Sequence, residues 1–221
     1  MHLEVPGAQG YAERAQELIA RYGSQTFEHK HRAELKVLPT QSGWALDIGA
    51  GAGADAAWLA ERGHKVVAVE PTSAFRQAAQ TLHPHAGIDW VDDSLPSLYV
   101  IRARKQRFDL VMLTAVWMHL EHGEREVGMH TLASLLAPRG VIVMSLRHGP
   151  VPEGRRMFEV TDAETIQLAS GVGFKCVLNV MTESSGTVNR AAGVTWNRLT
   201  FKWRREPCRA ERVCLSPHST R

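Results

Sequence analysis

The chain has 221 residues, of which 44% are hydrophobic and 22% charged, and its formal net charge is +3. This length and composition favour one α/β domain, and we find neither an apolar run long enough to cross a bilayer nor a basic-then-apolar signal pattern. The three cysteines, an odd number, argue against a disulfide framework and favour a reducing cytoplasm.

The positive charge lies at the C-terminal end of the chain. Five arginines and two glutamates follow residue 203 and account for the whole +3, so the rest is formally neutral. This distribution argues against a polyanionic partner such as nucleic acid. We expect a flexible basic tail over 204–221, in which Cys208, Cys214 and His218 are spaced too widely for a structural zinc site.

Residues 1–40 are expected to form a helical lid segment, with a helix from Ala12 to Tyr22. Strands and helices then alternate. Strands are predicted over 44–48, 66–70, 88–91, 108–114, 141–146, 174–180 and 194–203, and helices over 54–62, 73–82, 123–136 and 162–170. The alternation predicts a doubly wound, mostly parallel seven-stranded sheet with helices on both faces and its last two strands antiparallel at the edge.

The most informative stretch, ALDIGAGAG, ends the first strand. Gly49, Gly51 and Gly53 stand at alternate positions and make a turn too tight for side chains, where the amides that open the next helix can donate to a ligand. Glu70 follows the next strand, about twenty residues further on, where a carboxylate can hold ribose hydroxyls. Together these residues predict a pocket for an adenosine-type cofactor.

Two cofactors fit the glycines. A dinucleotide pattern is satisfied by Gly49, Gly51 and Ala54, whereas the S-adenosylmethionine (SAM) pattern adds Asp47 and Gly53. An aspartate in the floor of the site would repel a pyrophosphate, but it favours the ammonium and sulfonium of SAM. The residues therefore favour SAM over NAD.

Five segments in register resemble the class I SAM-dependent methyltransferases, of Rossmann-like fold. They are Ala45–Gly53, Val66–Pro71, Trp90–Pro96, Phe108–Leu113 and Leu135–Val143. The resemblance implies a methyltransferase domain over residues 41–203 and does not extend to any one subfamily.

The resemblance also implies roles in cofactor binding. The methionine part would contact Asp47, Gly49, Ala50, Gly51 and Gly53, the ribose Glu70 and Pro71, and the adenine Asp92, Asp93 and Ser94, with Thr114 and Trp117 following the fourth strand. Asp92 is preferred over Asp93 for the adenine because it directly follows its strand. Trp117 either lies against the cofactor, where its ring would attract a cation, or belongs to the core.

Catalytic candidates leave the ends of the fourth and fifth strands. A histidine side chain has an unperturbed pKa of about 6.5, which suits a general base at neutral pH. His119 and His148 are therefore candidates for that role, and either can instead pack without moving a proton. Arg147 ends an apolar strand, so it should reach the ligand crevice as an anion clamp or find a buried partner. For Arg155 and Arg156 a solvated surface position is the better interpretation.

Other polar groups are weaker candidates. The lid segment offers Tyr11, Tyr22, Phe27, His29 and His31, and the loop before the last strand offers Asn189 and Arg190. On a helix, His29 and His31 would point to different faces, so they suit no metal, and no metal site is expected. The basic run of Arg102, Arg104, Lys105 and Arg107 is interpreted as a solvated face.

We therefore expect a SAM-dependent methyltransferase that acts on an N, O or S atom of a small molecule. We expect it to be a monomer or homodimer that does not associate with a membrane. The first alternative is an RNA or protein methyltransferase, although Thr114–Trp117 lacks the Asn/Asp-Pro-Pro-aromatic signature of enzymes that methylate base amines. The second alternative is an NAD-binding oxidoreductase or a silent adenosine-binding module.

Overall fold

A computed structural model describes residues 26–84 and 87–204. The expected helix from Ala12 to Tyr22, the lid candidate Tyr11 and the C-terminal tail with Cys208, Cys214 and His218 lie outside these residues.

The described chain alternates strands and helices, as expected. The strands are β1 (Trp44–Ile48), β2 (Lys65–Val69), β3 (Ile88–Val91), β4 (Phe108–Leu113), β5 (Leu136–His148), β6 (Phe174–Glu183) and β7 (Thr195–Trp203). The helices are α2 (Phe27–Lys30), α3 (Ala54–Glu61), α4 (Ser73–Leu82), α5 (Tyr99–Ala103), the 3-10 helix η2 (Trp117–His119), α6 (His122–Leu135), α7 (Asp162–Gly171) and α8 (Thr187–Ala191).

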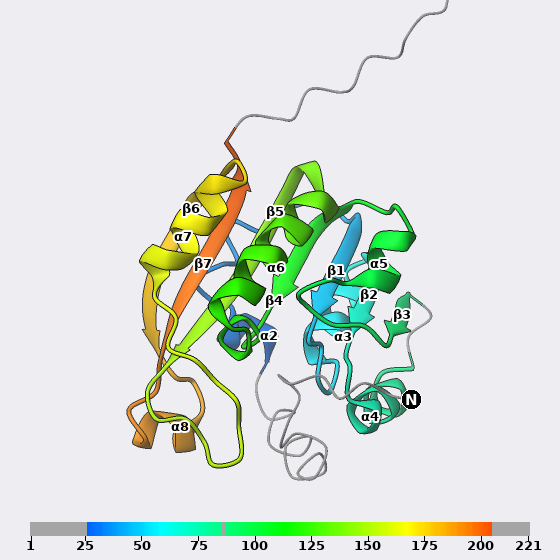
Figure 1. Ribbon diagram of the computed structural model, residues 1–221. Coiled ribbons are helices and arrows are strands. Elements are labelled where there is room, and N and C mark those ends of the chain that lie inside the picture. Colours follow the sequence, from blue (N-terminus) through cyan, green and yellow to red (C-terminus); the bar gives the residue numbers. More distant parts are fainter. Residues whose placement is uncertain (1–25, 85–86, 205–221) are drawn as a thin grey trace, which may run out of the picture.

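The strands form one seven-stranded sheet in the order β3-β2-β1-β4-β5-β7-β6 (Figure 1). β7 is antiparallel to both of its neighbours, whereas the other pairs are parallel. The predicted fold class is confirmed, and the reversed strand is β7, one place in from the edge strand β6. The strand order turns back between β1 and β4, and ligands of such sheets bind beyond the carboxyl ends of the strands at that point.

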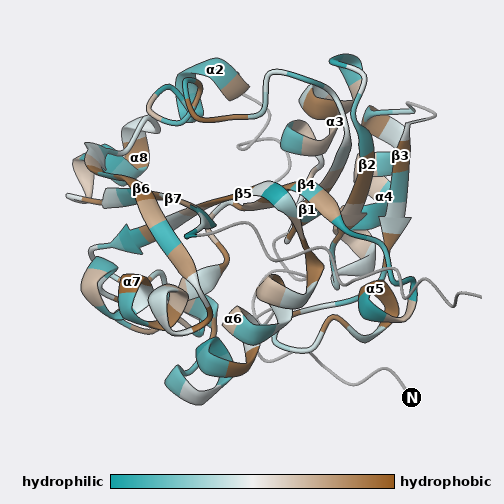
Figure 2. Cartoon of the chain, turned by 90° about the horizontal axis from the view of Figure 1, so that it is seen from above, coloured by the Kyte–Doolittle hydropathy of each residue, from teal (hydrophilic) through white to brown (hydrophobic). Residues whose placement is uncertain are grey.

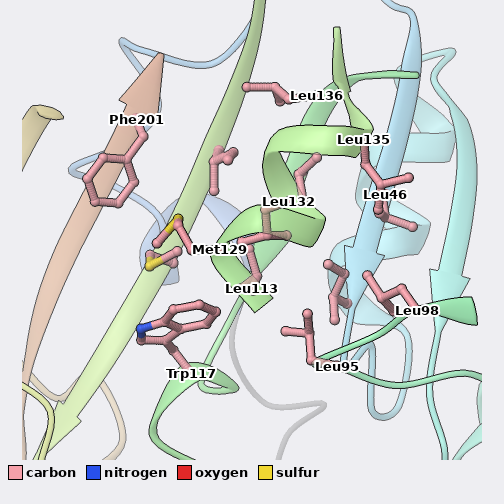
Figure 3. Close-up of a cluster of buried hydrophobic side chains, with 14 of the residues drawn as sticks. Leu46, Leu95, Leu98, Leu113, Trp117, Met129, Leu132, Leu135, Leu136 and Phe201 are labelled. Carbon is pink, nitrogen blue, oxygen red and sulfur yellow. The ribbon is translucent and has the colours of Figure 1, made fainter. Parts of the chain in front are cut away.

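Helices cover both faces of the sheet: α2 and α3 lie on one, and α5, α6 and α7 on the other (Figure 2). Successive side chains of β1 alternate between two hydrophobic clusters. Leu46 and Ile48 pack in the larger cluster under α6, and Ala45 packs with Phe27 and Leu59 in the smaller one. Figure 3 shows the larger cluster, built around Trp117 and the apolar side of α6.

The largest differences from the predicted elements concern β5, α5 and α8. β5 begins at Leu136, because Phe108 of β4 pairs with it before a register shift carries the ladder past Pro138 and Gly140. α5 and α8 are five-residue helices in segments expected as loops. Among the residues that the structure describes, no helix is long and apolar enough to cross a membrane.

Candidate active site

A cavity of about 830 Å³ opens beyond the carboxyl ends of β1, β2 and β4. It extends to the segments around α2 and α8 and to strands β5 and β7. Nine of the residues assigned to cofactor binding from the sequence line it, and so does one catalytic candidate, His119. The nine are Asp47, Gly49, Ala50, Gly51, Glu70, Pro71, Asp93, Ser94 and Thr114. Gly53, Asp92, Trp117, Arg147 and His148 do not line it.

The turn after β1 needs glycine for two different reasons. Gly49, Gly51 and Gly53 all have positive φ angles, of 68°, 55° and 85°. A Cβ on Gly49 or Gly53 would lie 2.5 Å from a side-chain atom of Val116 or Trp90, so these two glycines permit close packing. A Cβ on Gly51 would meet no atom within 4 Å, which leaves its backbone exposed toward the cavity.

Glu70 follows β2 with its carboxylate held by backbone amides. Gly51 N donates to Oε2 and Thr72 N to Oε1, both at 2.9 Å, and the side chain is buried. Burial raises the pKa of Glu70, although these amide hydrogen bonds oppose the shift. The carboxylate is thus fixed at the cavity wall beside the glycine turn.

Asp47, in β1, is the least satisfied carboxylate of the site. It is 2% exposed, and its Oδ2 accepts no hydrogen bond from the described residues. Burial, and then the charge of Asp55, raise the pKa of Asp47 to about 7. A cationic ligand in the cavity would provide the partner that this carboxylate lacks.

Asp55 lines the cavity but was missed in the sequence, where it reads as an ordinary first-turn acid of a helix. Its carboxylate contacts Lys30 Nζ at 2.5 Å and accepts hydrogen bonds from His31 Nε2 at 3.0 Å and Thr114 Oγ1 at 2.9 Å. Burial would raise the pKa of Asp55, but Lys30 and His31 outweigh it and lower that pKa. Asp55 therefore ties the α2 segment and the end of β4 to the start of α3.

The two acids after β3 have different surroundings, and the preference for Asp92 is wrong in its placement. Asp92 pairs with Arg76 at 2.8 Å and does not line the cavity. Asp93 lines it, and its carboxylate also accepts from the amides of Val100 and Ile101 at 2.8 and 3.0 Å, which fixes the start of α5.

Trp117 is a core residue, so its assignment to the cofactor is wrong. Its side chain is fully buried (Figure 3), and a Cβ on Gly128 of α6 would lie 3.3 Å from its ring. Trp117 therefore packs against α6 in the larger hydrophobic cluster and does not line the cavity.

His119 lines the cavity and is buried. Its Nδ1 lies 2.7 Å from the carbonyl oxygen of Arg156. Because a carbonyl only accepts, Nδ1 carries the proton in the neutral ring and Nε2 is the basic nitrogen. Burial, reinforced by the charges of Arg155, Arg147 and Arg156, lowers the pKa of His119 against the opposing effect of that hydrogen bond.

The other candidates from β5 bond elsewhere. Nη1 of Arg147 donates to the carbonyls of Gly149 and Pro150 at 3.3 and 2.8 Å, and His148 Nε2 lies 2.7 Å from Asn197 Oδ1. The expectation that Arg147 projects into the crevice is therefore wrong, because neighbouring carbonyls hold its guanidinium.

Some of the remaining candidates line the cavity, and others are packed or hydrogen-bonded elsewhere. His29 and Asn189 line the cavity, whereas Phe27 packs on Trp58 with ring centroids 3.7 Å apart and Arg190 donates to the carbonyl of Ser184 at 3.0 Å. In the part of the chain that the structure describes, no three His, Cys, Asp or Glu side chains are grouped to hold a metal.

The far end of the cavity was not predicted from the sequence. Its wall includes Ser145 on β5, Trp196 and Arg198 on β7, and residues 184–189. The reasoning applied to Arg147, that an arginine in an apolar strand must find a ligand or a buried partner, applies equally to Arg198, but it does not place Arg198 in the cavity wall.

The chain matches known methyltransferases in sequence. Residues 46–144 match the family described as a methyltransferase domain. An uncharacterised methyltransferase from Oceanobacillus iheyensis is 26% identical over 155 residues, which are 69% of this chain and 66% of the relative. The chain thus spans just under two thirds of that relative's length.

Solved structures share the fold. The N-methyltransferase NodS from Bradyrhizobium japonicum, in complex with S-adenosylhomocysteine (SAH), has a TM-score of 0.64 at 14% identity, covering 87% of this chain and 97% of NodS. The 1,6-didemethyltoxoflavin-N1-methyltransferase from Burkholderia thailandensis, with SAH bound, has a TM-score of 0.62 at 18% identity and 91% coverage of both chains. The chain therefore shares the class I, Rossmann-like fold of these methyltransferases.

Proposed function

We propose that this chain transfers the methyl group of SAM to an N, O or S atom of a small-molecule acceptor. The observation that carries the proposal is the buried Asp47 carboxylate, whose Oδ2 lacks a hydrogen-bond partner among the described residues and which lines the same cavity as Gly51 and Glu70. The methyltransferase family match and the SAH-bound structural relatives support the same cofactor.

The residues fit SAM better than a dinucleotide. Asp47 can accept a hydrogen bond from an ammonium, Gly51 leaves room for a ligand against the backbone, and Glu70 is placed for ribose hydroxyls. Asp93 and Ser94 line the same cavity, and we assign them to the adenine. A pyrophosphate would instead meet the carboxylate of Asp47, and like charges repel.

SAM, when bound, supplies an electrophilic methyl group on a sulfonium. The chain has to align the acceptor and exclude water, and such alignment can provide about 7–11 kcal/mol of the barrier. The lining residues of the α2 and α8 segments, among them Lys30 and Asn189, enclose the reacting region. His119 Nε2 is the group that we assign to accept a proton from an acceptor that must lose one.

A small acceptor is favoured by the dimensions of the site. A cavity of about 830 Å³ is typical of small-molecule sites, and the formally neutral chain before residue 204 offers little attraction to a polyanion. We also place the enzyme in the cytoplasm, a proposal that rests on its odd number of cysteines.

Calorimetry with SAM, SAH and NAD⁺ tests the cofactor. We expect saturable binding of SAM and SAH and none of NAD⁺; saturable NAD⁺ binding without SAM binding would overturn the proposal. A screen of metabolite pools with methyl-labelled SAM, followed by mass identification of the labelled product, then tests the acceptor. Labelling found only in RNA or protein fractions would contradict a small-molecule acceptor.

A further inference from the structure

Arg198 of β7 is a buried arginine in the cavity wall, on the β5 side and three strands away from β1. Only 5% of the residue is exposed. Its Nη1 has no hydrogen-bond partner among the described residues, and the Glu34 carboxylate lies 3.8 Å away, beyond hydrogen-bond distance. A desolvated guanidinium with an unused donor is costly unless a ligand completes its bonding.

The surroundings hold this guanidinium in place. Its Nε donates to Thr182 Oγ1 at 3.4 Å, and its central carbon lies 5.6 Å from the centroid of the Trp196 ring. Ser145 is its direct partner across the β5–β7 ladder, so their side chains lie on the same face of the sheet. Trp196 and Ser145 also line the cavity, which puts a flat apolar surface and a hydroxyl beside the cation.

The carboxylates near Arg198 are shared with other basic side chains. Glu34 lies 3.8 Å from both Arg198 Nη1 and His31 Nδ1, and Asp55 pairs with His31 and Lys30. Burial would lower the pKa of His31, but the Asp55 and Glu34 carboxylates outweigh it and raise that pKa. Glu34 is thus shared between Arg198 and His31, and Asp55 is engaged by Lys30 and His31, so neither carboxylate is available to Arg198 alone.

We propose that Arg198 binds a carboxylate group of the methyl acceptor, with the flat part of the acceptor packed on Trp196. This inference rests on the proposed methyltransferase function and names the class of its substrate. A guanidinium matches a carboxylate with two parallel hydrogen bonds. A phosphate dianion fits less well, because Asp47, Asp55 and Glu70 line the same cavity and would repel the second charge.

The chain provides a matched control in Arg147. It is the cross-strand partner of Trp196, but its Nη1 is bonded to the Gly149 and Pro150 carbonyls and its side chain does not line the cavity. Arg147→Gln and Arg198→Gln remove the same charge from adjacent strands, and only the second removes it from the cavity.

The probe pair is benzoate and benzamide, which have one shape and differ in charge. Each is titrated into SAH-saturated protein and followed by ligand-observed NMR and by tryptophan fluorescence. We expect saturable benzoate binding at least tenfold tighter than benzamide binding, because hydrogen bonds to a charged group are worth about ten- to a hundredfold in affinity. No saturable benzoate binding, or equal binding of both probes, would overturn the assignment.

Arg198→Gln should weaken benzoate binding about ten- to a hundredfold and leave SAH affinity within about twofold. Arg147→Gln should bind benzoate as the natural chain does. Glu34→Gln removes the nearest competing carboxylate and should strengthen benzoate binding several-fold. SAH binding is measured in every sample, which separates the two possible failures. If the natural chain does not bind SAH, the proposed function is refuted. If Arg198→Gln still binds SAH and its benzoate affinity is unchanged, this inference alone is refuted. If Arg198→Gln does not fold, Arg198→Lys replaces it, because lysine keeps the positive charge opposite Glu34 but not the planar guanidinium. Arg198→Lys should bind benzoate at least about fivefold more weakly than the natural chain. Unchanged benzoate affinity in this variant would count against the inference.

Discussion

The burial of Asp47 makes one carboxylate matter to both stability and binding. Its pKa is raised to about 7 in the folded protein, against about 3.9 for an unfolded chain. A raised pKa of an acid means that the folded state holds its proton longer, so ionisation between pH 4 and 7 destabilises the fold.

Asp47→Asn should therefore stabilise the fold increasingly as pH rises. We expect its gain in unfolding free energy to be larger at pH 8 than at pH 5, by about 1–3 kcal/mol, together with weaker SAM binding. Thermal or urea unfolding at both pH values measures the first effect and calorimetry the second. An equal gain at both pH values would show that Asp47 does not titrate in this range.

Glu70 offers the most direct test of the ribose position. Glu70→Ala should weaken SAM binding about ten- to a hundredfold, since it removes a carboxylate that Gly51 and Thr72 hold in place. The matched control is Asp92→Ala, an acid of the neighbouring strand end that does not line the cavity and should bind SAM normally. Equal losses in both variants, measured by calorimetry, would withdraw the role given to Glu70.

His119 should act as a neutral base. Since its pKa is lowered below the ordinary 6.5, kcat/KM should rise with pH through that lowered pKa and be flat above it. His119→Asn keeps a donor for the Arg156 carbonyl and removes the basic nitrogen, so kcat should fall about 100- to 10,000-fold for an acceptor that loses a proton. His148→Asn is the control; an undiminished rate in His119→Asn would assign the histidine to packing.

At the scale of elements, Asp55 anchors the α2 segment over the sheet. Asp55→Asn leaves Lys30 and the 1%-exposed His31 without their carboxylate, and should cost about 3–5 kcal/mol of unfolding free energy. Asp89→Asn, which breaks the exposed pair with Arg104, should cost no more than about 1 kcal/mol. Urea unfolding separates the two, and similar small losses would deny Asp55 this anchoring role.

The wild-type protein should also lose the Asp55 contribution in acid. A lowered folded-state pKa stabilises the fold above the unfolded value of about 3.9, and this stabilisation disappears as pH falls toward the folded-state pKa. The neighbouring His31 behaves oppositely: its raised pKa stabilises the fold below about 6.5 and is lost at higher pH.

The sheet could be predicted from the sequence because hydrophobic periodicity and turn-forming residues are local features. Apolar strands, the alternate glycines and the acid after β2 are readable in short windows, and β3 and α4 have the bounds expected. Side-chain direction is different, because it depends on packing partners distant in sequence. The positions of Trp117 and Arg147 in the sequence favour the site. In the structure, however, the Trp117 ring packs against Gly128, and the Gly149 and Pro150 carbonyls accept hydrogen bonds from Arg147.

The wall from β7 was missed for a topological reason. Arg198 comes near the cofactor half only because β7 runs backwards beside β5, which places its first residues at the same end as the carboxyl ends of the parallel strands. No sequence window contains that juxtaposition.

Over the whole molecule, ligand binding should appear as stability. The cavity wall draws on strands across the sheet, so SAH can bind only the folded chain. At a hundred times its Kd, SAH should add about 2.7 kcal/mol, which for a chain of this length raises the Tm by about 5–11 °C. Differential scanning fluorimetry with NAD⁺ as the comparison measures this; an unchanged Tm at saturating SAH would contradict it.

The reversal of β7 divides the cavity between two stretches of chain. The wall nearest the glycine turn is drawn from residues 47–116, and much of the opposite wall from 184–198, a single arm that leaves and re-enters the sheet. Such an arm can diverge, lengthen or be exchanged between enzymes while the nucleoside half stays intact. If the proposed function holds, changes confined to the roughly fifteen residues of this arm should alter the choice of acceptor, and grafting the arm onto a related scaffold would test this.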